Sequence, residues 1–524
     1  METKMFCYQC EQTAKGTGCT VCGACGKDDA VARAQDRLTG ALVGLARAAE
    51  DRSERLTDET EDLFVRGLFM TVTNVCFDKE ALATMTDRVR AEKARIGSAE
   101  DYDLTDLWRE HEDVRSLKSL VLFGLRGLAA YAYHAKALGR RDQRVMCFFP
   151  AALRAVGAQG ARVEDLIRLV LSVGEVNLLC LELLDRANTR TYGVPAPVRV
   201  PLTVGKGPFI VVTGHDLKDL ELLLKQCVGR GVDVYTHGEM LPAHGYPGLR
   251  QYRHLKGHFG TAWQNQQQEF TDAPGAFLFT TNCLMPPRPG YKDNVFTTGP
   301  VSFPGVRHIG EGKDFAPVIE RARRLGGYGA DHEMAGANGG KTMTTGFGWE
   351  TVLSVAPRLV KAIGSGAVRR LFLVGGCDGQ RGSRSYYAEL VRRMPRDTIV
   401  LTLACGKFRF NDLDLGQVAG LPRLIDLGQC NDAYGAVRVL QALADALGRQ
   451  VDELPLSVFL SWYEQKAVAV LLSLLHLGIR GIRLGPTLPA FVSPDVLQVL
   501  SDVYGLKPTT DPSADLEAAL SPCD

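Results

Sequence analysis

Five cysteines gather near the start of the chain, in the segment MFCYQCEQTAKGTGCTVCGACGK at positions 5–27. Cys7 and Cys10 form a C-x2-C pair, and three more cysteines follow at positions 19, 22 and 25. Zinc sites often add histidines, and none occurs before His111, whereas iron–sulfur clusters accept four thiolates at irregular spacing. Glycines in the segment let a backbone wrap closely around a cluster. The segment therefore predicts a folded iron–sulfur loop.

Further candidate ligands stand at the ends of short apolar runs later in the chain. The runs are FIVVTGH, VDVYTHGE, AFLFTTNC, LFLVGGC, TIVLTLAC and RLIDLGQC, and their candidate ligands are His215, Glu239, Cys283, Cys377, Cys405 and Cys430. A single cysteine or histidine after a strand is more often a packing residue, but the repetition favours one shared site. Ligands bind at the carboxyl ends of parallel strands, so distant residues can converge on one crevice. The mixed sulfur, nitrogen and oxygen donors indicate an iron site with oxygen ligands or open positions.

The elements that must position these residues change character along the chain. From Asp28 to about Asn188, apolar residues recur at helical spacing with few prolines, which predicts helical bundles. The stretch TYGVPAPVRVPLTVGKGP at 191–208 breaks that pattern, and beyond it short apolar runs alternate with helical ones. We therefore expect a multidomain α and α/β protein with N-terminal helical bundles, then two Rossmann-like α/β domains with mainly parallel sheets. The expected domains are an iron–sulfur loop and helical bundle over 1–190, a central α/β domain over 191–350 and a C-terminal α/β domain over 351–524.

Composition and charge exclude several classes of partner. The 61 basic and 60 acidic side chains nearly cancel, so no field attracts nucleic acid or an anionic membrane. The longest apolar run, at 467–479, is too short to cross a bilayer, and the first residues carry no secretory signal. Fourteen cysteines in a reducing compartment are typical of thiols or metal ligands. We expect a cytoplasmic monomer with no nucleic-acid or membrane partner and no bound nucleotide or flavin.

Several long motifs carry a resemblance to one known family. Together with the opening cysteines, the segments THGEMLPAHGYP, TTNCLMPP, GGCDG, ACGKFRFN, LGQCNDAYGA and WYEQKAVAVLLSLLHLGIRGIRLGPTLPAF resemble the hybrid cluster protein family, also called prismane proteins or hydroxylamine reductases. The resemblance covers essentially the whole chain. The spacing C-x2-C-x8-C-x5-C is similar to the family form that carries a [4Fe–4S] rather than a [2Fe–2S] cluster, and its cysteines are Cys7, Cys10, Cys19 and Cys25.

The resemblance also implies a second, hybrid iron–sulfur–oxygen cluster, [4Fe–2O–2S]. Its ligands would be His215, Glu239, Cys283, Cys377, Cys405, Cys430 and Glu464. Cys377 matches the cysteine that carries a persulfide in the family. Glu464 comes from the resemblance alone, because by itself it is typical of an ordinary first-turn helix carboxylate. Cys22 departs from the family pattern and is a fifth thiol for four positions, either a spare or an alternative ligand.

The activity implied is reduction of a small nitrogen oxide, with hydroxylamine reduced to ammonia and water and nitric oxide reduced to nitrous oxide as a second role. Electrons would come from a protein donor, either a ferredoxin, a rubredoxin or a dedicated reductase, and pass through the N-terminal cluster. Protons would come from Glu239, Glu464 or Lys466, each able to serve as a general acid. Two alternatives stay open: a nickel-containing enzyme like carbon monoxide dehydrogenase, and a non-catalytic nitric oxide sensor or a protein nitrosylase that acts through Cys377.

Overall fold

Helices form the N-terminal part of the chain in the computed structural model, which describes residues 5–50, 56–97 and 99–521. Aspartate or threonine side chains cap the first helices by accepting hydrogen bonds from backbone N–H groups, as Asp28 does from Val31. The expectation of helices from Asp28 to about Asn188 is confirmed, and the last helix extends to Tyr192. These helices are α1 (Asp29–Ala48), α2 (Asp58–Met70), α3 (Lys79–Ile96), α4 (Leu104–Arg109), α5 (Glu112–Ala137), α6 (Gln143–Gly157) and α7 (Val163–Tyr192).

A six-stranded sheet with only parallel pairings follows, in the order β5-β4-β3-β6-β7-β8. The first strand, β3, is central. Strands β4 and β5 follow on one side of it, and β6, β7 and β8 then follow on the other side. Such a reversal leaves a crevice at the carboxyl ends of the two central strands. The strands are β3 (Phe209–Thr213), β4 (Asp233–His237), β5 (Leu255–His258), β6 (Ala276–Phe279), β7 (Val295–Thr298) and β8 (Arg307–Ile309).

A second six-stranded parallel sheet repeats this topology, in the order β15-β12-β11-β16-β17-β18. Its reversal lies between β11 and β16. The expectation of two Rossmann-like parallel sheets is therefore confirmed, whereas the boundaries at 190 and 350 stay predictions. The strands are β11 (Arg370–Gly376), β12 (Thr398–Thr402), β15 (Leu424–Asp426), β16 (Leu456–Ser461), β17 (Arg483–Gly485) and β18 (Lys507–Pro508).

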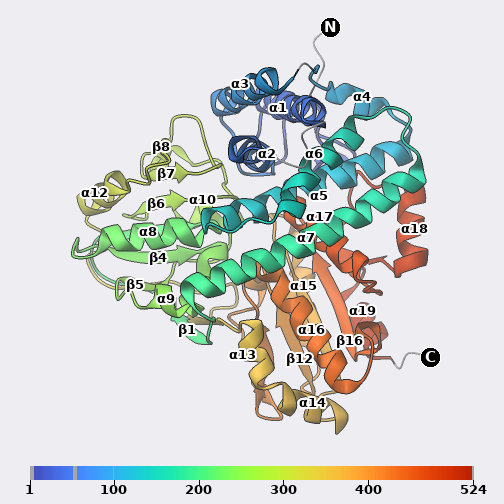
Figure 1. Cartoon of the computed structure of the whole chain (residues 1–524). Coiled ribbons are helices and arrows are strands. Elements are labelled where there is room, and N and C mark those ends of the chain that lie inside the picture. Colours follow the sequence, from blue (N-terminus) through green and yellow to red (C-terminus); the bar gives the residue numbers. More distant parts are fainter. Residues whose placement is uncertain (1–4, 51–55, 98, 522–524) are drawn as a thin grey trace.

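The remaining elements connect and cover these sheets (Figure 1). The short strands pair antiparallel as β1 (Val198–Pro201) with β10 (Thr342–Thr345), β2 (Thr203–Val204) with β9 (His332–Glu333), and β13 (Gln417–Val418) with β14 (Leu421–Pro422). The other helices are α8 (Leu217–Cys227), α9 (Pro247–Arg250), α10 (Gln266–Glu269), α11 (Pro289–Lys292), α12 (Ala316–Leu325), α13 (Trp349–Ser354), α14 (Ala356–Gly364), α15 (Ser385–Arg393), α16 (Ala433–Leu447), α17 (Gln465–His476), α18 (Pro494–Tyr504) and α19 (Pro512–Leu520).

Helix α17 follows strand β16 of the second sheet in the chain, but it packs against α5 and α7 of the N-terminal part (Figure 1). Two glycines allow this close approach. A Cβ at Gly174 would lie 2.2 Å from the carbonyl oxygen of Leu472, and one at Gly127 would lie 2.5 Å from that of Gln465. The C-terminal half of the chain therefore completes the core of the helical part.

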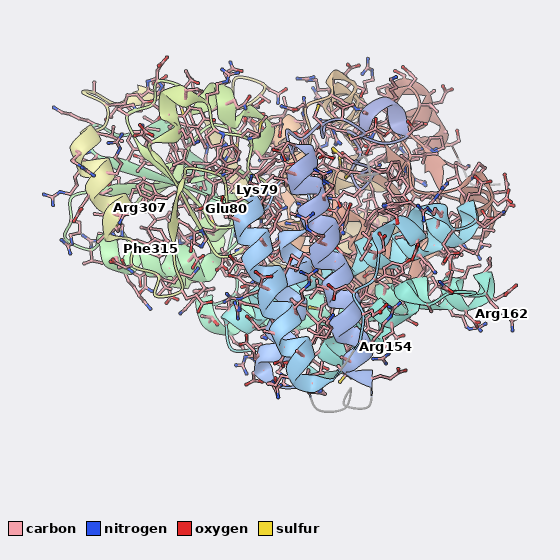
Figure 2. The ribbon with its side chains drawn as sticks, turned by 90° about the horizontal axis from the view of Figure 1, so that it is seen from above. Lys79, Glu80, Arg154, Arg162, Arg307 and Phe315 are labelled. Atoms are coloured by element: carbon pink, nitrogen blue, oxygen red, sulfur yellow. The ribbon has the colours of Figure 1, made fainter. Side chains whose placement is uncertain are left out.

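The helical part lies beside the first sheet. Viewed from above, α3 begins at Lys79 and Glu80 and runs alongside α1, with the sheet that contains Arg307 to one side (Figure 2). Among the helices that the structure describes, none combines the length and the apolar character needed to cross a membrane.

Candidate metal centres

The strand ends of both sheets meet at one cavity. Two pairs of its lining residues straddle the reversals: His215 and Cys283 follow β3 and β6, and Cys377 and Glu464 follow β11 and β16. The structure thus brings together every residue predicted for the hybrid cluster, and it adds Lys466 to them; their role as ligands stays a prediction. These lining residues are His215, Glu239, Cys283, Cys377, Cys405, Cys430, Glu464 and Lys466.

His215 is held with its Nε2 atom toward the cavity. Gly214 precedes it at φ +111°, and a Cβ there would lie 2.4 Å from the hydroxyl of Thr280, so the turn that places the histidine requires glycine. The ring Nδ1 lies 3.0 Å from Thr281 Oγ1, and Nε2 lies 3.0 Å from Lys466 Nζ. Burial, helped by the nearby Lys466 ammonium, holds the pKa of His215 well below its usual value. The imidazole is therefore neutral, the form that binds metals.

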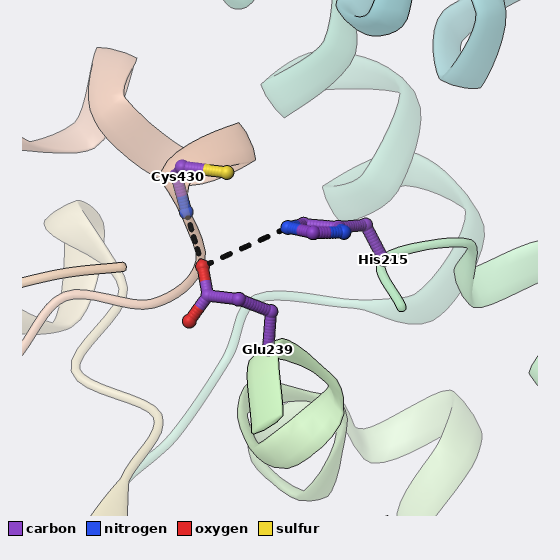
Figure 3. A group of neighbouring side chains, drawn as sticks. All are labelled: His215, Glu239 and Cys430. Carbon is purple, nitrogen blue, oxygen red and sulfur yellow. Dashed lines mark hydrogen bonds and ion pairs between the residues drawn. The ribbon is translucent and has the colours of Figure 1, made fainter. Parts of the chain in front are cut away.

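Glu239 presents one free carboxylate oxygen in the cavity. Its Oε2 atom accepts a hydrogen bond of 2.9 Å from the backbone N–H of Cys430 and lies 3.9 Å from His215 Nε2 (Figure 3). Its Oε1 atom is buried and has no hydrogen-bond partner. Burial raises the pKa of this carboxyl group. Ligand atoms of His215, Glu239 and Cys430 all lie within 4.8 Å of one another, so the free oxygen fits a metal-binding role.

Four cysteine thiols line the cavity. Burial raises the pKa of Cys377 to about 12 and raises the pKa values of Cys283, Cys405 and Cys430 well above the usual range, with negative neighbours adding to the effect. The Sγ atom of Cys405 accepts a hydrogen bond of 3.0 Å from the backbone N–H of Asp378. Four thiolates around one cavity would need bound cations to balance their charge, and a coordinating metal deprotonates the thiols. The thiols therefore fit a site for several metal ions.

Glu464 and Lys466 belong to one short turn at the start of α17. The carboxylate of Glu464 caps the helix by accepting from the backbone N–H of Lys466 at 2.7 Å, and its Oε1 atom lies 3.8 Å from Lys466 Nζ. The Lys466 side chain is only 1% exposed. Burial lowers the pKa of Lys466, but Cys430, Glu464 and other negative neighbours outweigh it, so the net pKa is raised and the ammonium stays charged.

Reasoning from residue types alone missed Glu464 as well as several other residues that line the cavity. Strand β16 ends at Ser461, so Glu464 also follows a strand end, which is the signal that could have found it. Trp263 and Tyr463 form one wall, with ring centroids 4.7 Å apart. Asn282 completes the lining and lies 3.5 Å from a carboxylate oxygen of Glu464. Its place directly before Cys283 was the available signal.

His237 lies beside the cavity and does not line it. Its ring is fully buried and lies 3.0 Å from both Thr213 Oγ1 and Glu269 Oε2. Both ring nitrogens are therefore occupied by protein partners, as expected of a packing residue.

The opening cysteines form a compact loop held by its own backbone. Cys7 and Cys19 exchange two backbone hydrogen bonds, of 3.0 and 2.8 Å. Cys10 and Cys19 are buried, Cys7 and Cys25 are partly buried, and Cys22 is exposed. The four cysteines predicted as ligands are therefore the four that pack against the protein.

The positions of these sulfurs can be compared with those expected around a single zinc ion. Around one tetrahedral zinc, sulfurs bonded at about 2.3 Å lie within about 4 Å of one another. Within the described part of the chain, no three sulfurs of this loop lie within 4.8 Å of one another. Lys27, only 7% exposed, lies beside Cys7 and donates to Gln35 Oε1 at 2.8 Å. A buried cation beside Cys7 suits an anionic cluster.

Comparisons of the sequence with known proteins identify full-length relatives. A family model described as Prismane/CO dehydrogenase family matches residues 5–517. A hydroxylamine reductase of Thermodesulfovibrio yellowstonii is 49% identical over 548 aligned positions, which cover 98% of this chain and 100% of the relative. A hydroxylamine reductase of Syntrophobacter fumaroxidans is 50% identical with the same coverage.

Solved structures with the same architecture are carbon monoxide dehydrogenases. Carbon monoxide dehydrogenase IV from Carboxydothermus hydrogenoformans matches 98% of this chain and 92% of its own, with a TM-score of 0.57 and 15% identity. The enzyme from Thermococcus sp. AM4 gives a TM-score of 0.56 and 17% identity, covering 98% of this chain and 90% of its own. At such identities the likeness concerns the fold alone.

Proposed function

The chain belongs to the Prismane/CO dehydrogenase family, and from that premise we propose that it reduces hydroxylamine to ammonia and water. The reaction consumes two electrons and two protons per hydroxylamine and breaks the N–O bond. Full-length relatives at 49% and 50% identity carry the name hydroxylamine reductase. The observation that carries the proposal is the donor set of the cavity, where nitrogen, oxygen and sulfur ligands converge from both sheets.

Membership of the family implies iron–sulfur clusters, and the proposal assigns two. Cys7, Cys10, Cys19 and Cys25 would hold a [4Fe–4S] cluster. The cavity would hold a [4Fe–2O–2S] hybrid cluster, with Cys377 as a persulfide. The free Glu239 Oε1 atom and the four thiols that line the cavity support this assignment, because both call for bound cations. The ligands of the hybrid cluster would be His215, Glu239, Cys283, Cys377, Cys405, Cys430 and Glu464.

The side chains around the cavity position a substrate and supply its protons. A bound hybrid cluster supplies electrons and a Lewis-acidic iron. The Lys466 ammonium, held between His215 Nε2 and Glu464, is placed to donate a proton to the departing oxygen, with Glu239 and Glu464 as the other candidate acids. The rings of Trp263 and Tyr463 keep water away from one wall, which strengthens electrostatic interactions inside.

Electrons would reach this cavity from the opening loop. The proposal includes a protein donor, either a ferredoxin, a rubredoxin or a dedicated reductase, that reduces the N-terminal cluster of a cytoplasmic monomer. Nitric oxide would be a second substrate, reduced to nitrous oxide at the same cavity.

The test is anaerobic purification followed by iron, sulfide and nickel analysis, electron paramagnetic resonance (EPR) and measurement of ammonia from hydroxylamine. We expect two iron–sulfur signals, no stoichiometric nickel and electron-dependent ammonia formation. Stoichiometric nickel would favour an enzyme like carbon monoxide dehydrogenase. Nitric oxide binding without turnover of either substrate would favour a sensor or a nitrosylase acting through Cys377.

A further inference from the structure

The segment that contains Cys10 lies directly against the segment that contains Glu464. The backbone N–H of Glu11 donates to the carbonyl oxygen of Tyr463 at 2.9 Å. The side chain of Gln465 donates to the carbonyl oxygen of Gln9 at 2.7 Å. Glu11 directly follows Cys10, a predicted ligand in the opening loop, and Tyr463 directly precedes Glu464, a predicted ligand in the cavity. One backbone hydrogen bond therefore links the neighbours of two predicted ligands, one from each centre.

The side chain of Tyr463 lies between the two sets of thiols. It is fully buried, lines the cavity and lies within electrostatic reach of Cys10 and Cys25 on one side and of Cys283 on the other. Its hydroxyl donates to Asn74 Oδ1 at 3.2 Å, which fixes the ring. The contact between segments 9–11 and 463–465, here called the junction, thus joins the two candidate metal centres.

A buried ion pair holds this junction together. Arg384 Nη2 lies 2.9 Å from Glu11 Oε2 and donates to the carbonyl oxygen of Trp462 at 2.8 Å. Arg384 Nη1 donates to the carbonyl oxygen of Cys377 at 3.1 Å and to Ser461 Oγ. One guanidinium group therefore contacts the opening loop and the backbone on both sides of the reversal in the second sheet.

Because the ion pair is buried, its main role is to fix the relative positions of the groups around it. The side chains of Glu11 and Arg384 are 0% and 1% exposed. Removing two charges from water offsets most of their attraction, so a buried ion pair adds little net stability, although a fixed arrangement can depend on it. The five directional donors of arginine suit this purpose, because several acceptors can be held at once.

We propose that Glu11 and Arg384 are positioning residues that hold the opening loop against the inner cavity so that electrons pass between the two metal centres. The inference rests on the proposed function, because it needs a cluster at each centre. Electrons would cross between the two centres through the segments at 9–11 and 463–465, which these residues hold in contact. Neither residue lines the cavity.

The test uses the full-length, iron-loaded protein with Arg384→Met, and with Glu11→Gln as a second variant that keeps the side-chain volume. After rapid mixing with dithionite, freeze-quenched EPR follows the reduction of each cluster separately. We expect both variants to hold parental iron and to reduce the N-terminal cluster at the parental rate. Electron arrival at the inner cluster should slow severalfold, because the rate of electron tunnelling falls steeply as the separation of the two clusters grows.

Arg423→Met is the matched control. Arg423 is also a buried arginine that donates to several backbone carbonyl oxygens, including those of Thr398 and Leu415, but it contacts neither the opening loop nor the cavity. General loss of stability would slow all three variants alike and would contradict the proposal. Parental transfer rates in iron-loaded Arg384→Met and Glu11→Gln would overturn it, as would loss of iron in both. Failure of the parent protein to reduce hydroxylamine would count against the proposed function instead, since cluster-to-cluster transfer is measured without substrate.

Discussion

The two candidate metal centres are built in opposite ways. The opening loop takes its four predicted ligands from one segment between Cys7 and Cys25, and all four are thiols. The inner cavity takes its predicted ligands from segments spread between His215 and Glu464, and mixes three kinds of donor atom. A local loop can form a site by its own folding, whereas the cavity exists only when two sheets and α17 are assembled.

The two centres also differ in exposure, and this difference suits them to different chemistry. The loop exposes Cys22 and leaves Cys7 and Cys25 partly buried, so a protein partner can approach it. Five of the seven predicted cavity ligands are buried, Cys283 and Cys430 are partly buried, and all of them follow strand ends, which hold ligand positions more precisely than loops do. The loop therefore suits electron transfer, and the cavity suits reaction with a small molecule.

Glu239→Gln should have the largest effect, because it removes an anionic ligand from the inner cavity while leaving the loop untouched. Iron at the inner site should be lost or altered, and ammonia formation should fall by roughly 100-fold or more. Iron per chain, EPR and ammonia assays measure this under anaerobic conditions. His237→Gln is the neighbouring control, and it should keep the cluster. A Glu239→Gln protein that retains the cluster and its activity would remove the ligand assignment and the mechanism built on it.

Lys466→Met should separate proton supply from cluster assembly within the cavity. It removes the ammonium 3.0 Å from His215 Nε2, and loss of a general acid costs about 100-fold in rate. The inner cluster should keep its EPR signal. Lys118→Met, which changes another buried lysine paired with Glu110, controls for the loss of a buried charge. Equal activity losses in the two variants would mean that Lys466 has no special role in proton transfer.

Cys10→Ser should show that the two centres assemble independently but work in series. The N-terminal cluster should be lost or altered while the inner site keeps its iron, because its predicted ligands come from other segments. Turnover driven by a protein donor should fall roughly 10- to 100-fold. Undiminished turnover with that donor would eliminate the relay role of the loop.

Cys22→Ser should have the smallest effect, since the exposed thiol lies outside the packed part of the loop. Iron content and the EPR signal of the N-terminal cluster should match those of the parent, whereas Cys19→Ser should lose them. If the outcomes are reversed, Cys22 rather than Cys19 is the fourth ligand.

The sequence predicted the inner site through strand ends because side-chain type and strand pattern are local properties. His215, Cys283 and Cys377 follow apolar runs that could be read directly. Their convergence required only the rule that parallel sheets expose their carboxyl ends together. The pairing of the two reversals, β3 with β6 and β11 with β16, depends on strand order and could not be read from any single run.

Other features were beyond the sequence because they depend on long-range packing. The run at residues 467–479 is the longest apolar run of the chain, but the sequence does not indicate which helices it packs against. Its place between α5 and α7 depends on Gly127 and Gly174, which look like ordinary glycines in a helix. The pairing of Glu11 with Arg384 joins residues far apart in the chain, and nothing in either local pattern indicates it.

Helix α17 is synthesised late, because it lies near the end of the chain, and this has a consequence for folding during translation. A ribosome releases the cysteine loop and helices α5 and α7 long before it synthesises the segment that ends at His476. Until then, the surface around Gly127 and Gly174 lacks its covering helix, and the backbone of Glu11 lacks Tyr463 as a partner. Apolar surface exposed in this way promotes aggregation of incomplete chains. Metal loading of the inner cavity must therefore follow translation, and nascent chains need protection until the last part of the protein emerges.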